Sequence, residues 1–108
     1  MGPEELAKRI TLGKAPAIVD ARTVFEFRAG HIEGAIHAQI WRILLRLAPL
    51  PGDRDTEMVV LCALGPRAMM AKLLLNAFGY RNVSLLAGHM AGWRRLGLPL
   101  VKQKRDEG

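Results

Sequence analysis

The chain has 108 residues, half of them hydrophobic and 24% charged, so we expect residues 1–108 to form one compact domain. This composition excludes disordered, collagenous and disulfide-stapled chains, and the single cysteine, Cys62, indicates a reducing, cytoplasmic setting. The net charge of +6 is spread along the sequence and aromatic residues make up 6%, which argues against nucleic-acid binding and favours a surface with a mild preference for anions.

No segment has the pattern of a signal peptide or of a membrane span. Charged residues break up the first twelve positions, and Arg46 and Lys72 interrupt the longer apolar stretches. We therefore expect no association with a membrane. The residues from 102 to 108 are polar, and we expect them to form a flexible end.

Helical and strand patterns alternate along the chain. Pro3 in a first turn, a capping box formed by Thr23 and Glu26, and Gly79 after an apolar run mark helix boundaries. The predicted helices are 3–12, 24–29, 40–47, 66–78 and 89–96, and the predicted strands are 17–20, 35–36, 58–61 and 83–86. This alternation indicates an α/β fold, with a parallel sheet and helices on both faces.

The helix predicted at 66–78 offers many apolar residues for burial. We expect its buried face to include Met69, Met70, Leu73, Leu74 and Ala77. Trp93 is expected to anchor the last helix in the core.

Cys62 follows the most continuous apolar run of the chain, at the carboxyl end of the strand predicted at 58–61. Ligand sites of parallel α/β sheets lie beyond this edge. The next residues bring Gly65, Arg67 and a helix start within six positions, so backbone amides, a helix dipole and a guanidinium are all close to the thiol. Such a field favours the thiolate, the nucleophilic form of cysteine. The alternative interpretation is that Cys62 is one more buried apolar residue of the strand.

Several motifs occur in an order that resembles the rhodanese domain. They are Asp20-Ala21-Arg22, Glu26-Phe27, GHIEGA at 30–35, CALGPR at 62–67, Gly79-Tyr80, and Gly88 with Trp93. The resemblance covers nearly the whole chain and implies a rhodanese-like three-layer domain, in which a central five-stranded, mostly parallel sheet is flanked by helices on both faces. It also implies a sulfurtransferase of the thiosulfate:cyanide type that needs no metal and no organic cofactor.

The resemblance further implies roles for the residues of the loop. Cys62 would be the nucleophile that takes a sulfur atom from thiosulfate or a persulfide donor and holds it as a persulfide. A thiol, a cyanide-like acceptor or a partner protein would then remove that sulfur. The Arg67 side chain and the loop backbone would stabilise donor and persulfide, the loop being formed by Ala63, Leu64, Gly65, Pro66, Arg67 and Ala68.

The chain departs from the rhodanese pattern at positions that bear on the substrate. Family members often carry a basic residue after the cysteine and a serine after the arginine, where this chain has Ala63 and Ala68. Pro66 has no backbone N–H, and His89 stands where a second glycine is common. These departures weaken the case for thiosulfate, a small dianion, and favour a persulfide or a protein-bound donor.

Two other functions fit part of the pattern. A cysteine-dependent phosphatase also pairs a thiolate with an arginine, but the related phosphatases use a loop one residue longer. A rhodanese-like binding or regulatory module would keep Cys62 without turnover.

Three more residues are candidates for supporting the site. We interpret Asp20 and Arg22 as a structural ion pair or helix cap, and His31 as a residue that holds its own turn by hydrogen bonds. His37 and His89 have no partners at metal-ligand spacing, so we expect no metal site.

Overall fold

The computed structural model describes residues 1–102, so part of the tail predicted to be flexible, residues 103–108, lies outside the described residues. Each helix and strand lies where the sequence pattern predicts an element of its type. The helices are α1 (Pro3–Thr11), α2 (Val24–Ala29), α3 (Ile40–Leu44), α4 (Pro66–Ala77) and α5 (His89–Arg95), and the strands are β1 (Ala17–Asp20), β2 (Ile36–His37), β3 (Met58–Leu61) and β4 (Val83–Leu85).

The strands form one parallel sheet in the order β2-β1-β3-β4. The expected parallel arrangement is confirmed, but the expected number of strands is wrong, since the described residues contain four strands and not five. One further pairing joins His31 and Val101, which exchange N–H···O bonds of 2.9 and 2.8 Å. It extends no further because Ile32 enters a turn that the N–H of Ala35 closes on the Ile32 carbonyl.

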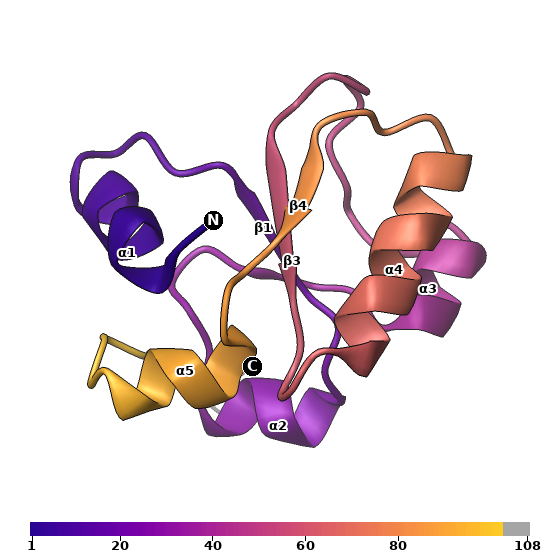
Figure 1. Cartoon of the computed structure of the whole chain (residues 1–108). Helices are drawn as coiled ribbons and strands as arrows, with labels where there is room; N and C mark the ends of the chain where they lie inside the picture. Colours follow the sequence, from indigo (N-terminus) through magenta and orange to yellow (C-terminus); the bar gives the residue numbers. More distant parts are fainter. Residues whose placement is uncertain (103–108) are drawn as a thin grey trace, which may run out of the picture.

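Helices cover both faces of the sheet, as expected, and α2 lies at the carboxyl edge of the strands (Figure 1). The side chains of β3 alternate between the two faces. Met58 and Val60 pack in the core under α3 and α4, whereas Val59 and Leu61 pack in the core that includes α1 and α5. Trp93 of α5 is 1% exposed and anchors this second core, as predicted.

Helix α3 is shorter than predicted, because it ends at Leu44 and not at residue 47. Arg46 adopts a left-handed backbone with a φ of 60°, and the N–H of Leu47 turns back to the Arg42 carbonyl at 2.8 Å. This turn directs Ala48 toward the core, which a continued helix would not do.

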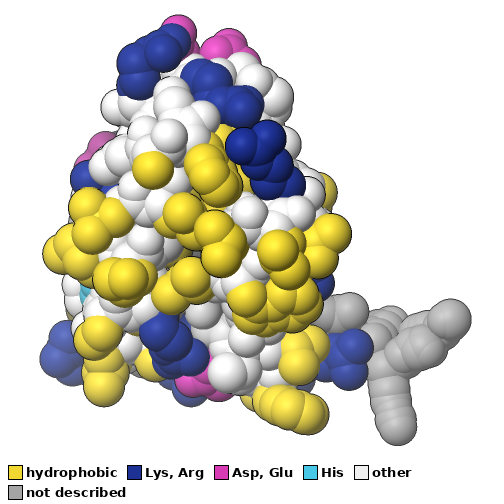
Figure 2. All heavy atoms as spheres, turned by 90° about the vertical axis from the view of Figure 1, so that its right-hand side faces the viewer, with side chains coloured by type: hydrophobic (Ala, Val, Ile, Leu, Met, Phe, Trp, Pro, Cys, Tyr) yellow, Lys and Arg dark blue, Asp and Glu magenta, His cyan; other side chains and the backbone are white. Residues whose placement is uncertain are grey.

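The buried face of α4 differs from the predicted one. Ala68, Ala71 and Leu75 face the sheet, and the small alanines let the helix pack closely on it. Of the residues predicted to be buried, Leu74 is partly buried and Ala77 is exposed. Figure 2 shows apolar side chains gathered on the outer face of α3 and α4, where the exposed large residues are Trp41, Leu44, Met69, Met70 and Leu73.

Membrane insertion by a helix finds no support in the described part of the chain. None of the helices in residues 1–102 combines the length and the apolar character that a bilayer-spanning helix needs.

Candidate active site

Cys62 lies directly beyond the end of β3, at the carboxyl edge of the sheet. Its Sγ accepts a hydrogen bond of 3.0 Å from the backbone N–H of Gly65. The loop curls back on the sulfur because Gly65 has a φ of 139°, a backbone conformation that L side chains rarely adopt. Helix α4 then begins at Pro66, whose missing N–H is tolerated at a first helical position. The loop therefore brings one amide hydrogen to the sulfur, and Pro66 supplies none.

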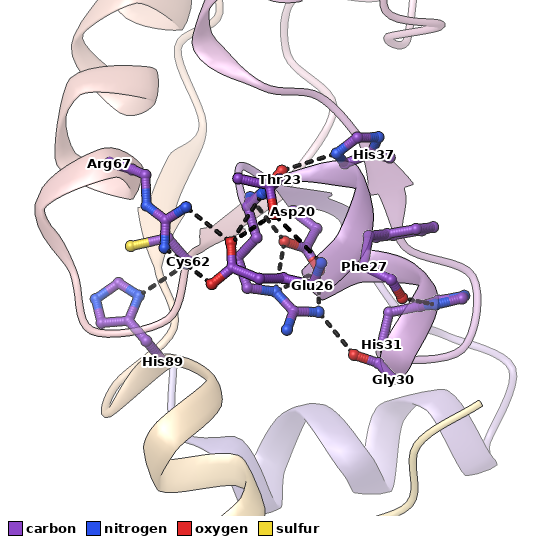
Figure 3. A network of polar contacts seen from close by, with 11 residues as sticks. Asp20, Thr23, Glu26, Phe27, Gly30, His31, His37, Cys62, Arg67 and His89 are labelled. Carbon is purple, nitrogen blue, oxygen red and sulfur yellow. Dashed lines mark hydrogen bonds and ion pairs between the residues drawn. The ribbon is translucent and has the colours of Figure 1, made fainter. Parts of the chain in front are cut away.

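The first turn of α5 fixes the backbone of the sulfur loop. The N–H of Met90 binds the Cys62 carbonyl at 3.0 Å, and the N–H of Ala91 binds the Ala63 carbonyl at 3.2 Å. The backbone N–H of Cys62 donates to Nδ1 of His89 at 3.3 Å (Figure 3). Both backbone groups of Cys62 are thus held by residues about 27 positions away, which limits the movement of its side chain.

Arg67 forms an ion pair with Glu26 of α2 (Figure 3). Its guanidinium donates hydrogen bonds of 2.8 and 3.3 Å to the two carboxylate oxygens, and both side chains are a little over one third exposed. Glu26 also accepts the N–H of Thr23 at 2.9 Å and so completes the capping box that the sequence predicts. The positive charge expected to bind an anionic donor is therefore largely neutralised by a carboxylate of the same chain.

This ion pair makes a contribution to stability that acid should remove. The hydrogen bond from Arg67, helped by those from Thr23, lowers the pKa of Glu26 from its ordinary value of 4.5 to about 2, although burial acts in the opposite direction. A carboxyl with a lowered pKa stabilises the folded state above 4.5, and this stabilisation disappears as the pH falls toward 2. The variant Glu26→Gln should therefore be less stable at neutral pH by at most about 1 kcal/mol, and equally stable near pH 2, in urea denaturation followed by circular dichroism.

A matched variant separates the ion pair from the helix cap. Glutamine at position 26 can still complete the capping box, whereas Thr23→Ala removes the cap and leaves the carboxylate next to Arg67. Thr23→Ala should cost about 1 kcal/mol at neutral pH and should keep most of that cost near pH 2, because the main cause of the lowered pKa of Glu26 is Arg67 and not Thr23. A Glu26→Gln deficit that persists unchanged near pH 2 would contradict the assignment.

Asp20 and Arg22 form a buried ion pair beside the loop, as the sequence predicts. Asp20 is 0% exposed and Arg22 is 2% exposed, and the shortest distance between their charged atoms is 2.8 Å. Arg22 also donates to the Gly30 carbonyl at 2.8 Å, which ties the end of α2 to the end of β1. The carboxylate and two of the three guanidinium nitrogens, Nε and Nη2, are engaged within the fold, so we interpret the pair as structural.

His31 lies away from the sulfur, on the far side of α2. Its Nδ1 is 2.8 Å from the Phe27 carbonyl oxygen, and its ring stacks on the Phe27 ring at a centroid distance of 3.8 Å. Nε2 of His37 lies 2.7 Å from the Arg22 carbonyl oxygen. Both histidines therefore hold backbone carbonyls around α2, and the structure brings neither of them to the thiol.

The sulfur itself is enclosed. Cys62 has an exposed fraction of 0%, whereas Leu64 at the tip of the loop is 77% exposed. Two surface hollows flank the loop, and Cys62 lines neither of them. One is lined in part by Leu64 and Arg94, and the other in part by Trp41. A donor therefore reaches the sulfur only after a covering side chain moves.

The sequence from residue 2 to residue 96 matches the family model described as Rhodanese-like domain. The chain belongs to the rhodanese-like domain family. It is 35% identical over 98 residues to a sulfurtransferase of Allochromatium vinosum, covering 91% of this chain and 90% of that protein. It is 38% identical over 106 residues to the HTH-type transcriptional regulator Rv0324 of Mycobacterium tuberculosis, covering 96% of this chain and 43% of the regulator. The crystal structure of the Alr3790 protein from Anabaena is similar with a TM-score of 0.85 at 28% identity, covering 95% of this chain and 82% of that one.

These matches confirm the predicted resemblance and the rhodanese-like fold, and they place the chain among relatives that include a sulfurtransferase. In this rhodanese-like domain, sequence reasoning missed two contacts of the loop. Glu26 carries the signal of a helix cap, and nothing local indicates that it also pairs with Arg67, which lies 41 positions later. His89 departs from the glycine common at this position, but its bond to Cys62 follows only from the packing of α5.

Proposed function

We propose that this rhodanese-like protein is a sulfurtransferase that carries a sulfane sulfur on Cys62 as a persulfide. The single observation that carries the proposal is the hydrogen bond from the Gly65 N–H to the Cys62 sulfur, at the carboxyl edge of a parallel sheet. An N–H aimed at this sulfur stabilises it more strongly as an anion than as a neutral thiol. The lone thiol also suits the reducing cytoplasm, where we place the protein.

The transfer takes place in two displacements at sulfur. The Cys62 thiolate attacks the outer sulfur of a persulfide donor R–S–SH, the S–S bond of the donor breaks, and R–S⁻ leaves with the electron pair. Cys62 then holds an –S–SH group. An acceptor thiolate attacks the outer sulfur of that group, takes it as a new persulfide, and releases the Cys62 thiolate for the next cycle.

The surroundings of Cys62 favour a persulfide of low charge over thiosulfate as the donor. The Arg67 guanidinium is paired with Glu26, Pro66 has no N–H, and the neighbouring side chain of Ala63 is uncharged. A dianion entering this loop would lose its hydration without gaining the full charge of Arg67, which Glu26 neutralises, in return. A persulfide whose reacting sulfurs carry at most one negative charge loses less hydration free energy at the loop.

The proposal is tested by following sulfur on the intact protein. The reduced protein is incubated with glutathione persulfide or with thiosulfate, freed of excess donor, and weighed by mass spectrometry without reductant. We expect one added sulfur atom on Cys62, more complete with the persulfide, and its loss after addition of a thiol. A folded protein that takes up no sulfur from either donor would overturn the proposal, as would turnover of an aryl phosphate by the unmodified protein.

Releasing Arg67 from its partner should change the preference between donors. In Glu26→Gln the guanidinium no longer faces a carboxylate, so its charge becomes available to an anionic donor. An exposed ion pair is worth up to about 1 kcal/mol, so kcat/KM for thiosulfate should rise about three- to fivefold relative to that for glutathione persulfide. Thr23→Ala, which leaves the ion pair in place, is the control and should keep the wild-type ratio. An unchanged ratio in Glu26→Gln would show that the pair does not set the donor preference.

A regulatory module is the second candidate, and two observations favour it. Cys62 is fully buried, and one relative of 38% identity is named a transcriptional regulator, of which this chain spans 43%. A module of this kind would keep the fold and the loop and would not turn over. Sulfur that loads on Cys62 and is not removed by any thiol acceptor would favour this function over the transferase.

A further inference from the structure

His89 lies over the sulfur loop in a backbone conformation that is unusual for its residue type. Its φ is 51°, in the left-handed region that few residues other than glycine adopt without cost. One hydrogen bond fixes the imidazole in this conformation, and the ring lies close to Gly65. Nδ1 accepts the Cys62 N–H at 3.3 Å, and Nε2 lies 3.3 Å from the position that a Cβ on Gly65 would occupy. The ring therefore lies against the same glycine whose N–H holds the Cys62 sulfur.

The hydrogen bonds of the ring define which of its nitrogens carries the proton. Because Nδ1 accepts from a backbone N–H, the neutral ring carries its hydrogen on Nε2, the nitrogen nearer to Gly65. Burial lowers the pKa of His89, so the neutral ring is the dominant form at neutral pH. Figure 3 shows the imidazole and the Cys62 sulfur on the same side of the loop. The Nε2–H group of His89 is therefore a hydrogen-bond donor beside the loop, where Pro66 has no backbone N–H to donate.

We propose that His89 is a positioning and specificity-determining residue of the sulfur loop: its ring covers the Cys62 sulfur, excludes bulky donors, and donates Nε2–H to the outer sulfur of a Cys62 persulfide. The covering role is inferred from the bond of the ring to the Cys62 N–H and its position beside Gly65, whereas the role toward the persulfide rests on the proposed function. The class of donor that this arrangement admits is a persulfide carried on an unbranched methylene, as in a cysteinyl persulfide, because a donor that is bulky next to its sulfur must displace the ring and break its bond to the Cys62 N–H.

The covering role is tested by the rate at which Cys62 is alkylated, a measurement that requires no enzymatic activity. Glycine suits a φ of 51°, so His89→Gly removes the ring without straining the backbone. Displacing the ring costs the wild type one hydrogen bond, so alkylation of the variant by a bulky maleimide should be about tenfold faster. Iodoacetamide, which is smaller, should show a smaller acceleration. Equal maleimide rates in the two folded proteins would overturn the proposal.

A matched variant accounts for the flexibility that glycine adds. Arg46 also has a left-handed backbone, with a φ of 60°, and it lies in the turn after α3, where it contacts Phe78 and not the sulfur loop. Arg46→Gly therefore makes the same backbone change without uncovering the thiol. Its alkylation rate should equal that of the wild type. A similar acceleration in Arg46→Gly and His89→Gly would show that general loosening of the chain, and not the imidazole, controls access.

The role toward the persulfide is tested by its lifetime. Wild type and His89→Gly are loaded from glutathione persulfide, and loss of the added sulfur to a thiol is followed by mass spectrometry. We expect the variant to lose its sulfur about tenfold faster, since a hydrogen bond to an anionic sulfur is missing, and free imidazole to slow the loss again. Equal lifetimes would overturn this role. If neither protein takes up sulfur, the proposed function fails, and the alkylation rates still decide whether His89 covers the thiol.

Discussion

Cys62→Ser should abolish sulfur uptake from every donor while leaving the fold intact. Cys62 is the only cysteine of the chain, and a serine hydroxyl stays protonated and weakly nucleophilic at neutral pH. Transfer should fall by at least roughly three orders of magnitude, to the rate of the uncatalysed exchange. Mass spectrometry of the donor-treated protein and a kinetic assay with glutathione persulfide measure the two effects.

The serine variant also tests the hydrogen bond that holds the sulfur. A serine Oγ can accept the Gly65 N–H in place of Sγ, whereas Cys62→Ala leaves this partly buried amide without that partner. Cys62→Ala should therefore be less stable than Cys62→Ser by about 1 kcal/mol in urea denaturation. Sulfur transfer by Cys62→Ser well above the uncatalysed rate would mean that transfer does not pass through Cys62, and the transferase mechanism assigned to this residue would be lost.

Asp20→Ala should destabilise the protein by about 3–5 kcal/mol, the largest loss that we expect from a charged residue. Asp20 accepts the backbone N–H of Arg22 at 3.0 Å and three hydrogen bonds from the guanidinium, two of them from Nε, and both side chains are buried. Without the carboxylate, the Arg22 charge has no ionic partner in a region of low dielectric constant. The free energy of unfolding of a small domain is about 5–15 kcal/mol, so this single change removes a large part of it.

An exposed ion pair of the same chain provides the control for Asp20→Ala. Arg81 and Asp55 lie 2.7 Å apart, and both side chains are 67% exposed. Asp55→Ala should cost at most about 1 kcal/mol, because water screens the charges of an exposed pair. Urea denaturation of the two variants under the same conditions measures the difference. Equal losses would mean that burial does not determine the strength of the Asp20 contact.

The order and type of the elements follow from local sequence signals. The capping box of Thr23 and Glu26 begins α2 where predicted, and Gly79 follows α4 as predicted. The unbroken apolar run at 58–61 reads as a strand covered on both faces, which β3 is. These signals are reliable because each depends on a few adjacent residues and their own backbone groups.

Predictions from short stretches of sequence were wrong where the structure depends on contacts between residues far apart in the chain. Helix α4 is apolar on nearly all sides, so its sequence does not indicate that Ala71 faces the sheet while Met70 faces solvent. The helix predicted at 40–47 ends early because Arg46 turns the chain toward the core. The fifth strand implied by the family resemblance is absent from the sheet formed by residues 1–102, in which His31 and Val101 form only an isolated bridge.

The sequence by itself determined the α/β architecture, the family, and the position of Cys62 at the carboxyl edge of the central strand. Only the tertiary structure decided how that sulfur is surrounded. The neutralisation of Arg67 by Glu26 and the covering of Cys62 by His89 join residues 41 and 27 positions apart. Contacts of this kind arise when α2, α4 and α5 pack around one edge of the sheet, and no short-range pattern of residues encodes them.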